Sequence, residues 1–333
     1  MDYLEPETFD ALEDVGRRVF HQLSFKFDRS AGTIFLTGGH GVLTYRVASR
    51  LLQAGFPTVR VGALHADELS DLNKLGAEIA DFSWGKDETY KTALSGVKTV
   101  FCTPPHTEDW DEDFQVFLGA CEEAGVKHIV KVSFLHANKP DAELQEVPLV
   151  KLQGMCDKKL IQSGIAYTII APSHLMSNPL FQALESSEKP AKLYGASAGK
   201  AVNYISPNDV AEIAVRALLA PTDHVDKIYE LTGPMSVKEE QVAHHLSKFI
   251  GTPVLYVDRP LAFFRVEEQQ SGAPSWLLHD MVSLEKIKSL GHEGYTSFLS
   301  SDFESVCNHK PETFLDYLTN VEAMSPRERS LAA

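Results

Sequence analysis

Short apolar runs alternate with amphipathic segments through the first half of the chain. The apolar runs predict strands at residues 33–37, 58–64, 77–80, 98–102, 127–132 and 166–171. Apolar residues spaced three or four positions apart predict helices near residues 41–54, 66–75, 87–95, 110–124 and 149–163. Strands that alternate with helices in this way form a parallel sheet with helices on both of its faces. The pattern therefore predicts an α/β fold built on a doubly wound parallel sheet.

The alternation loosens after residue 175. Ser206-x-x-Asp209 and Ser236-x-x-Glu239 both have the capping-box pattern that opens a helix, and the second helix is expected to end at Gly251. Further strands are predicted at residues 227–231 and 254–257. We expect residues 176–325 to form a smaller, mostly helical region that interleaves with the main sheet.

The two ends of the chain stand outside this pattern. Within residues 1–30, apolar side chains recur every three or four positions, at Phe9, Leu12, Val15, Val19 and Leu23. This spacing predicts an amphipathic helix, an N-terminal extension that packs on the body of the protein. An interface or lid role is the alternative to a purely structural one. The last residues, 326–333, are expected to fray.

Composition and charge exclude several classes of protein. The 333 residues carry a net charge of −15, which argues against nucleic acid as a partner, because phosphate binding needs a basic surface. No apolar run approaches the ~20 residues of a membrane span, and the acidic start, Met1 to Asp14, lacks the apolar core of a signal peptide. The four cysteines lie far apart, with neither metal-ligand spacing nor a disulfide framework. We therefore expect a cytoplasmic protein with no membrane partner and no metal site.

A glycine-rich turn stands between the first predicted strand and the first predicted helix. It reads Thr37-Gly38-Gly39-His40-Gly41-Val42, and its spacing is Gly38-x-x-Gly41-x-x-Thr44. Glycines let the backbone approach a pyrophosphate, and the free amides at the start of a helix attract its negative charge. The turn therefore predicts a dinucleotide site, with an ordinary tight turn as the alternative.

A series of sequence words matches a known family in the same order along the chain. They are Thr37-Gly38-Gly39-His40-Gly41, Val59-Arg60-Val61-Gly62, Val100-Phe101-Cys102-Thr103-Pro104-Pro105, Lys127-His128-Ile129-Val130-Lys131-Val132-Ser133, Ser163-Gly164-Ile165-Ala166-Tyr167-Thr168, Asp209-Val210-Ala211 and Tyr229-Glu230-Leu231-Thr232-Gly233-Pro234. By these words, residues 33–260 resemble the NmrA-like branch of the atypical short-chain dehydrogenases/reductases. That branch includes NAD(P)H-dependent quinone reductases and redox-sensing regulators. The resemblance implies a dinucleotide-binding Rossmann domain over residues 31–175 and a substrate-binding region over residues 176–325.

The resemblance also implies which residues contact the cofactor. Besides Thr37, Gly38, Gly39, His40, Gly41 and Val42, they are Leu64, Asp81, Thr103, Pro104, Pro105, Ser133 and Lys151. An acid beside the adenosine ribose bonds its 2′-hydroxyl, and an arginine there pairs with a 2′-phosphate. The family often has arginine where this chain has Leu64, although His65 or Arg46 could still reach a phosphate. NADP(H) is therefore expected in preference to NAD(H), on a weak signal.

Two further positions depart from the family pattern. The family usually has glycine where this chain has Thr44, whose side chain could hold the first helix away from the sheet or bind a phosphate. Ordinary short-chain enzymes have a Tyr-x-x-x-Lys pair on the fifth helix, in which the lysine lowers the pKa of the tyrosine. Here the helix contains Gln153 and Asp157 instead. The candidates for acid/base catalysis are therefore Asp157 and two loop histidines, His136 and His174, each with a structural role as the alternative.

Side chains that follow the fifth and sixth strands could line a substrate pocket, because ligands bind at the carboxyl ends of parallel strands. The candidates are Phe134, Met176, Asn178, Phe181 and Tyr204. This mostly apolar set favours a flat, aromatic or otherwise hydrophobic ligand.

Three functions remain open. The first is an NAD(P)H-dependent reductase of a quinone, enone or imine, since the cofactor carries the chemistry and solvent can supply the proton. The second is a non-catalytic sensor that binds a dinucleotide and changes its contacts with a regulatory protein or within a homodimer. The third is an enzyme that catalyses rearrangement or cyclisation without hydride transfer. Fold alone does not separate them.

Overall fold

The computed structural model describes residues 32–64, 69–103, 107–139, 147–264, 275–290 and 298–322. The helix predicted within residues 1–30 and the tail at 326–333 lie outside these ranges. In the part of the chain that is described, no helix is long and apolar enough to cross a membrane.

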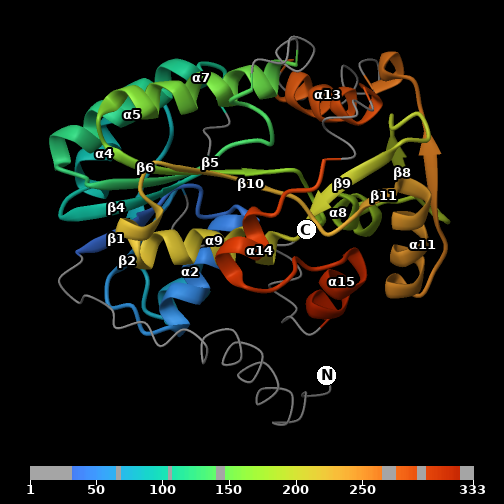
Figure 1. The fold of residues 1–333 in the computed structure, drawn as a ribbon, viewed down its shortest axis with the longest axis horizontal. Helices are drawn as coiled ribbons and strands as arrows, with labels where there is room; N and C mark the ends of the chain where they lie inside the picture. Colours follow the sequence, from blue (N-terminus) through green and yellow to red (C-terminus); the bar gives the residue numbers. More distant parts are fainter. Residues whose placement is uncertain are drawn as a thin grey trace.

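A seven-stranded sheet forms the centre of the molecule (Figure 1). The strands are β1 (Thr33–Leu36), β2 (Val59–Ala63), β3 (Glu78–Asp81), β4 (Val97–Cys102), β5 (His128–Val132), β6 (Ala166–Pro172) and β10 (Lys227–Leu231). All neighbours pair in parallel, and the spatial order is β10-β6-β5-β4-β1-β2-β3. Strands β2 and β3 are added on one side of β1, and β4, β5, β6 and β10 on the other, so the strand order reverses between β1 and β4.

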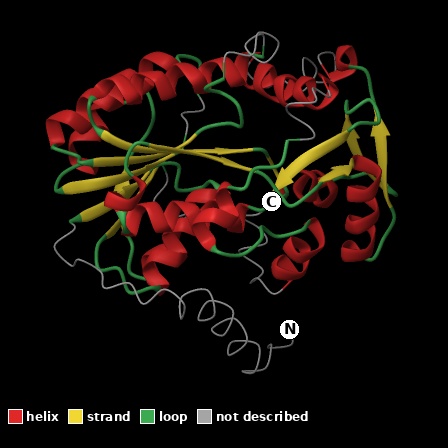
Figure 2. Ribbon diagram, in the orientation of Figure 1, coloured by secondary structure: helices red, strands yellow, loops and turns green. Residues whose placement is uncertain are grey.

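Helices cover both faces of this sheet (Figure 2). One face carries α2 (Val42–Gln53), α3 (Ser70–Lys74), α9 (Pro207–Leu219) and α14 (Asp302–Cys307). The other face carries α4 (Asp87–Ala93), α5 (Trp110–Ala124), α7 (Pro148–Ser163) and α13 (Ser275–Leu290). Strand β1 supplies both cores, because its side chains alternate: Ile34 and Leu36 pack with the first group of helices and Phe35 with the second. The predicted doubly wound fold is confirmed.

The C-terminal region adds helices beyond the carboxyl ends of the strands. They are α8 (Ser177–Glu185), α11 (Glu239–Ile250) and α15 (Phe314–Glu322), whereas the short α10 (Pro221–His224) joins α9 to the start of β10. Two small sheets accompany them: β7 (His174–Leu175), β9 (Ala201–Ile205) and β11 (Ser236–Lys238) form one, and β8 (Ala191–Gly195) and β12 (Val254–Asp258) form the other. Of these five strands, the sequence predicted only β12, as an apolar run at residues 254–257.

Two predicted helix starts have different outcomes. Ser206 does cap α9: its Oγ accepts a hydrogen bond of 3.0 Å from the Asn208 amide, and Pro207 occupies the first turn. The expectation that Ser236 caps a helix is wrong. Ser236 begins strand β11, which pairs antiparallel with β9, and α11 starts after Lys238. Pairing with β9 therefore prevails over the local capping signal.

Candidate functional site

The glycine-rich turn lies at the carboxyl end of β1, at the point where the strand order reverses. In open α/β sheets, the crevice outside the strand ends at this point binds ligands. The ends of β1 and β4 are joined there, because the Thr103 amide donates a 2.9 Å hydrogen bond to Thr37 Oγ1. The predicted cofactor residues Thr37 and Thr103 therefore share one edge of the crevice, while Pro104 and Pro105 lie outside the described residues.

Two glycines in the turn occupy positions where no larger residue fits. Gly38 has a φ of 65°, and a Cβ atom there would lie 2.4 Å from Thr103 Oγ1. The Gly39 amide donates a 3.0 Å hydrogen bond to the Gly62 carbonyl of β2, and a Cβ atom there would lie 2.8 Å from that oxygen. These contacts hold the turn close against β2 and β4, so that the backbone itself forms the floor of the crevice.

The start of helix α2 is open at the third glycine. Gly41 is the cap residue, it supplies no side-chain acceptor for the first-turn amides, and both His40 and Gly41 are exposed. A Cβ atom at Gly41 would come near only one other group, the Gly38 carbonyl, at 3.2 Å. Uncapped amides beside an exposed glycine are the arrangement that receives a pyrophosphate. The observed cradle therefore fits a dinucleotide.

Thr44 does not face the place where a phosphate would bind. Its side chain is fully buried, and Oγ1 donates a 2.7 Å hydrogen bond to the Thr37 carbonyl. Buried and bonded in this way, Oγ1 does not face the exposed crevice. Instead it ties the first turn of α2 to the end of β1, which explains how the loop tolerates threonine in place of glycine.

The edge of the site expected to hold the adenosine is lightly charged. Leu64 follows β2 with 51% of its surface exposed, and Asp81, the last residue of β3, is also exposed. Arg60 is held at the start of β2 by a 3.0 Å ion pair with Glu78. Arg46 donates a 2.8 Å hydrogen bond to Asn208 Oδ1 on α9 and is thereby held away from this edge, contrary to the suggestion that it reaches a phosphate. His65 lies outside the described residues.

Asp157 lies in a buried polar network rather than facing a substrate. Its side chain is 0% exposed, and Oδ1 lies 2.7 Å from Lys131 Nζ, a lysine that is equally buried within β5. Its Oδ2 accepts hydrogen bonds from Ser133 Oγ and, at 2.8 Å, from Asn138 Nδ2. Lys131 also donates a 2.7 Å bond to Gln153 Oε1. This geometry argues against an acid/base role for Asp157 and favours one in which α7 is held against β5.

The two candidate histidines are also buried by the fold. His174 is 2% exposed, and its ring lies between Phe134 and Tyr204, with centroids 5.8 and 6.0 Å away. Burial lowers the pKa of His174 well below its ordinary value, and the ammonium of Lys288 lowers that pKa further. Both effects favour the neutral ring, and the enclosure of His174 argues against direct proton transfer to a substrate.

His136 has a comparable position at the next strand end. It is 5% exposed, with a φ of 63°; its ring contacts Phe298 at 4.9 Å, and Nε2 lies 3.8 Å from Glu230 Oε1. Glu230 is in turn paired with Lys139 at 2.9 Å. These contacts favour a packing role, so the structure does not bring His136, His174 and Asp157 together as one catalytic group.

Two of the five predicted substrate residues line a cavity. It has a volume of about 170 Å³ and lies beyond the ends of β6 and β10. Its mostly apolar wall includes Met176, Tyr204, Met235, Val237, Phe314 and Leu315. Phe134 reaches this wall only through His174 and Tyr204, whereas Phe181 is half-buried against the adjacent core and Asn178 is exposed on α8.

Lys151 and Ser133, which are also predicted to contact the cofactor, differ in exposure. Lys151 is exposed in the first turn of α7, while Ser133 is buried and bonded to Asp157. Lys131 and Asn138, which were not predicted as site residues from the sequence, complete the Asp157 network. A lysine among the apolar residues Ile129, Val130 and Val132 of a predicted central strand was the available signal, because a buried charge requires a partner.

Comparisons with known proteins agree with this geometry. The NAD(P)H-binding family model matches residues 38–221, from the glycine turn to the start of α10. The chain is 28% identical to an NAD(P)H azoreductase of Xenophilus azovorans, over 85% of this chain and 96% of the relative. It is 32% identical to the (4-alkanoyl-5-oxo-2,5-dihydrofuran-3-yl)methyl phosphate reductase of Streptomyces griseus, over 67% of this chain and 76% of that protein.

A solved structure has the same fold. The NADPH-dependent quinone oxidoreductase of Escherichia coli, crystallised with NADPH, aligns with a TM-score of 0.72 and 22% identity, over 87% of this chain and all of that chain. The match of the family model over more than half of the chain is decisive, and the chain belongs to the NAD(P)H-binding family. The resemblance to NmrA-like dinucleotide-binding proteins is thereby confirmed.

Proposed function

We propose that this protein is an NAD(P)H-dependent reductase of a hydrophobic small molecule of the quinone, enone or imine type. The observation that carries the proposal is the open glycine cradle, Gly38 to Gly41, at the start of α2 and at the reversal point of the sheet. The named reductase activities of the relatives support an oxidoreductase.

The chain's own residues would bind and orient the cofactor. The amides at the start of α2 would hold the pyrophosphate, and the paired ends of β1 and β4, at Thr37 and Thr103, would form the wall beside the nicotinamide half. A bound nicotinamide supplies the hydride, and the protein supplies its placement. Lys151, exposed near the start of α7, is a candidate contact for the nicotinamide ribose.

The absence of a tyrosine–lysine pair on α7 is compatible with this function. Gln153 and Asp157 are both buried and bonded to Lys131, so they hold the helix in place rather than donate protons to a ligand. A quinone or similar acceptor takes its proton from solvent after hydride transfer, so reduction requires mainly positioning. The third candidate function, rearrangement or cyclisation, needs acid/base groups that face the substrate, and the three predicted ones are enclosed.

The apolar cavity beyond β6 and β10 is the proposed place for part of the substrate. Met176 follows β6 by four positions and Pro234 follows β10 by three, so both walls extend from the carboxyl edge that carries the cofactor cradle. Met235 and Leu315 are more than half exposed at the rim, which lets an apolar molecule enter from solvent. A mainly hydrophobic wall with few polar groups is typical of small-molecule sites.

We further propose that NADPH is used in preference to NADH. An acidic side chain after β2 would bond a free 2′-hydroxyl and repel a 2′-phosphate. The described residue there, Leu64, is neutral and exposed, so nothing at this position opposes the phosphate.

A turnover screen tests the proposal. Oxidation of NADPH would be followed by its loss of absorbance in the presence of quinones, enones, azo compounds and imines, with Gly41→Trp protein as the control that lacks the cradle. Turnover by the natural protein and not by the variant would support a reductase. Tight cofactor binding without oxidation by any acceptor class would overturn it and leave the sensor function in its place.

A further inference from the structure

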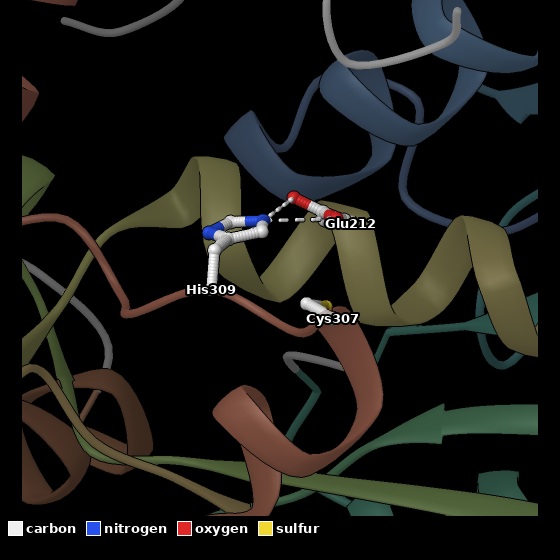
Figure 3. A group of neighbouring side chains, drawn as sticks. All are labelled: Glu212, Cys307 and His309. Carbon is white, nitrogen blue, oxygen red and sulfur yellow. Dashed lines mark hydrogen bonds and ion pairs between the residues drawn. The ribbon is translucent and has the colours of Figure 1, made fainter. Parts of the chain in front are cut away.

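Three potential metal ligands from two distant parts of the chain meet on the face of the sheet covered by α9 and α14. Glu212 projects from the middle of α9, Cys307 is the last residue of α14, and His309 follows two positions later (Figure 3). One ligand atom from each residue lies within 4.8 Å of the other two. Thiolate sulfur, imidazole nitrogen and carboxylate oxygen are all donors that zinc accepts.

The backbone after α14 brings the two C-terminal ligands to the same side. Asn308 ends the helix with a φ of 60°, and its amide donates a 2.9 Å hydrogen bond to the Glu304 carbonyl. This left-handed residue turns the chain back, so that His309 faces Glu212 while Cys307 stays in the core.

The histidine is oriented as metal-binding histidines are. Its Nδ1 lies 3.0 Å from the carbonyl of Lys310, so Nδ1–H donates there and fixes the ring. Nε2 then points at the Glu212 carboxylate, 3.3 Å from each oxygen. A neutral ring with its proton on Nδ1 would present a lone pair to a carboxylate, and a cation between the two groups removes that repulsion.

The carboxylate is held from behind by an arginine. Arg216, one turn further along α9, donates bonds of 2.8 and 3.2 Å to Glu212 Oε1, which leaves Oε2 facing His309. The Glu212 side chain is 8% exposed, Cys307 is 5% exposed, and the His309 side chain is 50% exposed. An ion could therefore enter past His309 and keep one coordination position open to water.

We propose that Glu212, Cys307 and His309 bind a divalent ion of the zinc type, with solvent as the fourth ligand. The site differs from the sequence expectation of no metal, because Glu212 is almost a hundred positions from Cys307 and His309 and the three have no motif spacing. It lies on a face of the sheet and not at the strand ends, so the ion would join α9 to the segment at 298–322 and stabilise the fold without taking part in turnover.

An alternative arrangement uses the same residues without a metal. A protonated His309 could complete an ion-paired triad with Glu212 and Arg216. The two arrangements differ in what Cys307 does, because an ion pair needs no thiolate and a zinc-type site needs one.

Titration of the full-length, chelator-treated protein with Co²⁺ and with Zn²⁺ tests the proposal. We expect a single Co²⁺ site with thiolate-to-metal charge-transfer absorption, displaced by Zn²⁺, and a melting temperature that rises with Zn²⁺ concentration. Mass action increases the folded-to-unfolded ratio about 100-fold when the ion is present at 100 times its Kd.

Cys307→Ser should abolish the charge-transfer band, and His309→Gln should weaken Zn²⁺ binding by about tenfold or more. His244→Gln, at an exposed histidine of α11, is the matched control and should change neither. Circular dichroism of the metal-free variants checks that each is folded. A Co²⁺ complex without thiolate absorption, equal Zn²⁺ affinity in all variants, or no binding at all would overturn the proposal.

Discussion

The buried network around Asp157 gives a sharp stability prediction. Lys131 Nζ and Asp157 Oδ1 are 2.7 Å apart, and both side chains are completely buried. Every charge in the pair is hydrogen-bonded: Lys131 also reaches Gln153 Oε1 and the Val132 carbonyl, and Asp157 also accepts from Ser133 and Asn138. Removal of one partner leaves an unpaired charge without access to water.

The expected magnitudes follow from that burial. Lys131→Met leaves a buried carboxylate with two neutral donors, and Asp157→Asn leaves a buried ammonium with neutral acceptors only, so each should reduce the free energy of unfolding by about 3–5 kcal/mol. The double variant Lys131→Met/Asp157→Leu has no unpaired charge, only hydroxyl and amide groups that lose a partner. Its loss should be about 2–4 kcal/mol, far below the sum of the single losses.

The same helix provides a control pair. Lys159 on α7 lies 2.7 Å from Asp111 Oδ1, but both side chains are about a quarter exposed. Lys159→Met should therefore reduce the free energy of unfolding by at most about 1 kcal/mol.

Urea unfolding measures the free energy of unfolding of all four variants. The values are comparable when the slope of that free energy against urea concentration is the same in each variant. The reasoning is refuted if Lys131→Met resembles Lys159→Met, or if the single losses add in the double variant to within about 0.5 kcal/mol.

The remaining predictions concern the cofactor site and one buried acid. Gly38→Ala should weaken NADPH binding and lower stability, because the added Cβ would meet a threonine oxygen at 2.4 Å. The control is Gly55→Ala, which has a φ of 78° and nothing within 4 Å and therefore introduces backbone strain alone. It should leave the NADPH affinity unchanged in calorimetry. Leu64→Arg should raise the ratio of NADPH to NADH affinity, whereas Leu75→Arg, a similarly exposed leucine after α3, should not; equal ratios in all three proteins would remove residue 64 from the ribose site. Burial raises the pKa of Asp209 from its ordinary value of 3.8 to about 8, so the folded state keeps a proton that the unfolded state releases above about pH 4. The contribution of Asp209 to stability is then full below pH 4 and declines as the pH rises to 8. Asp209→Asn resembles the protonated acid, so its free energy of unfolding in urea should rise relative to that of the natural protein as the pH rises over this range. A difference between the two proteins that does not change with pH would contradict the raised pKa of Asp209.

The sheet was predictable because each strand is a short apolar run next to a well-patterned helix. All seven strands of the large sheet were predicted to within one residue at each end. Ser206 was predictable as a cap because its hydroxyl acts locally on Asn208. Ser236 was not, because a long-range partner, β9, determines its conformation.

In the candidate site, too, locally determined features were predictable and features that depend on distant partners were not. The glycine turn carries its own geometry, since the backbone needs glycine at Gly38, with its positive φ, and Gly41 leaves the start of α2 without a side-chain cap. Asp157 was predicted as a possible catalytic acid because helix periodicity does not reveal that Lys131, on another element, neutralises it. The burial of His174 likewise depends on β9, a strand with no clear signal in the sequence.

Calorimetric titration with NADPH tests the central claim most directly. It would compare the natural protein, Gly41→Trp, and the control Gly119→Trp at a helical glycine of α5 with no atom within 4 Å of a built Cβ. Gly41 has an ordinary φ of −78°, so tryptophan there tests the space in front of the α2 amides rather than backbone strain.

We expect a single NADPH site in the natural and control proteins, and a loss of affinity of at least about 100-fold, equivalent to about 2.8 kcal/mol, in Gly41→Trp. Equal affinity in all three folded proteins would show that the cofactor does not bind at this turn, and the account of the site would be wrong.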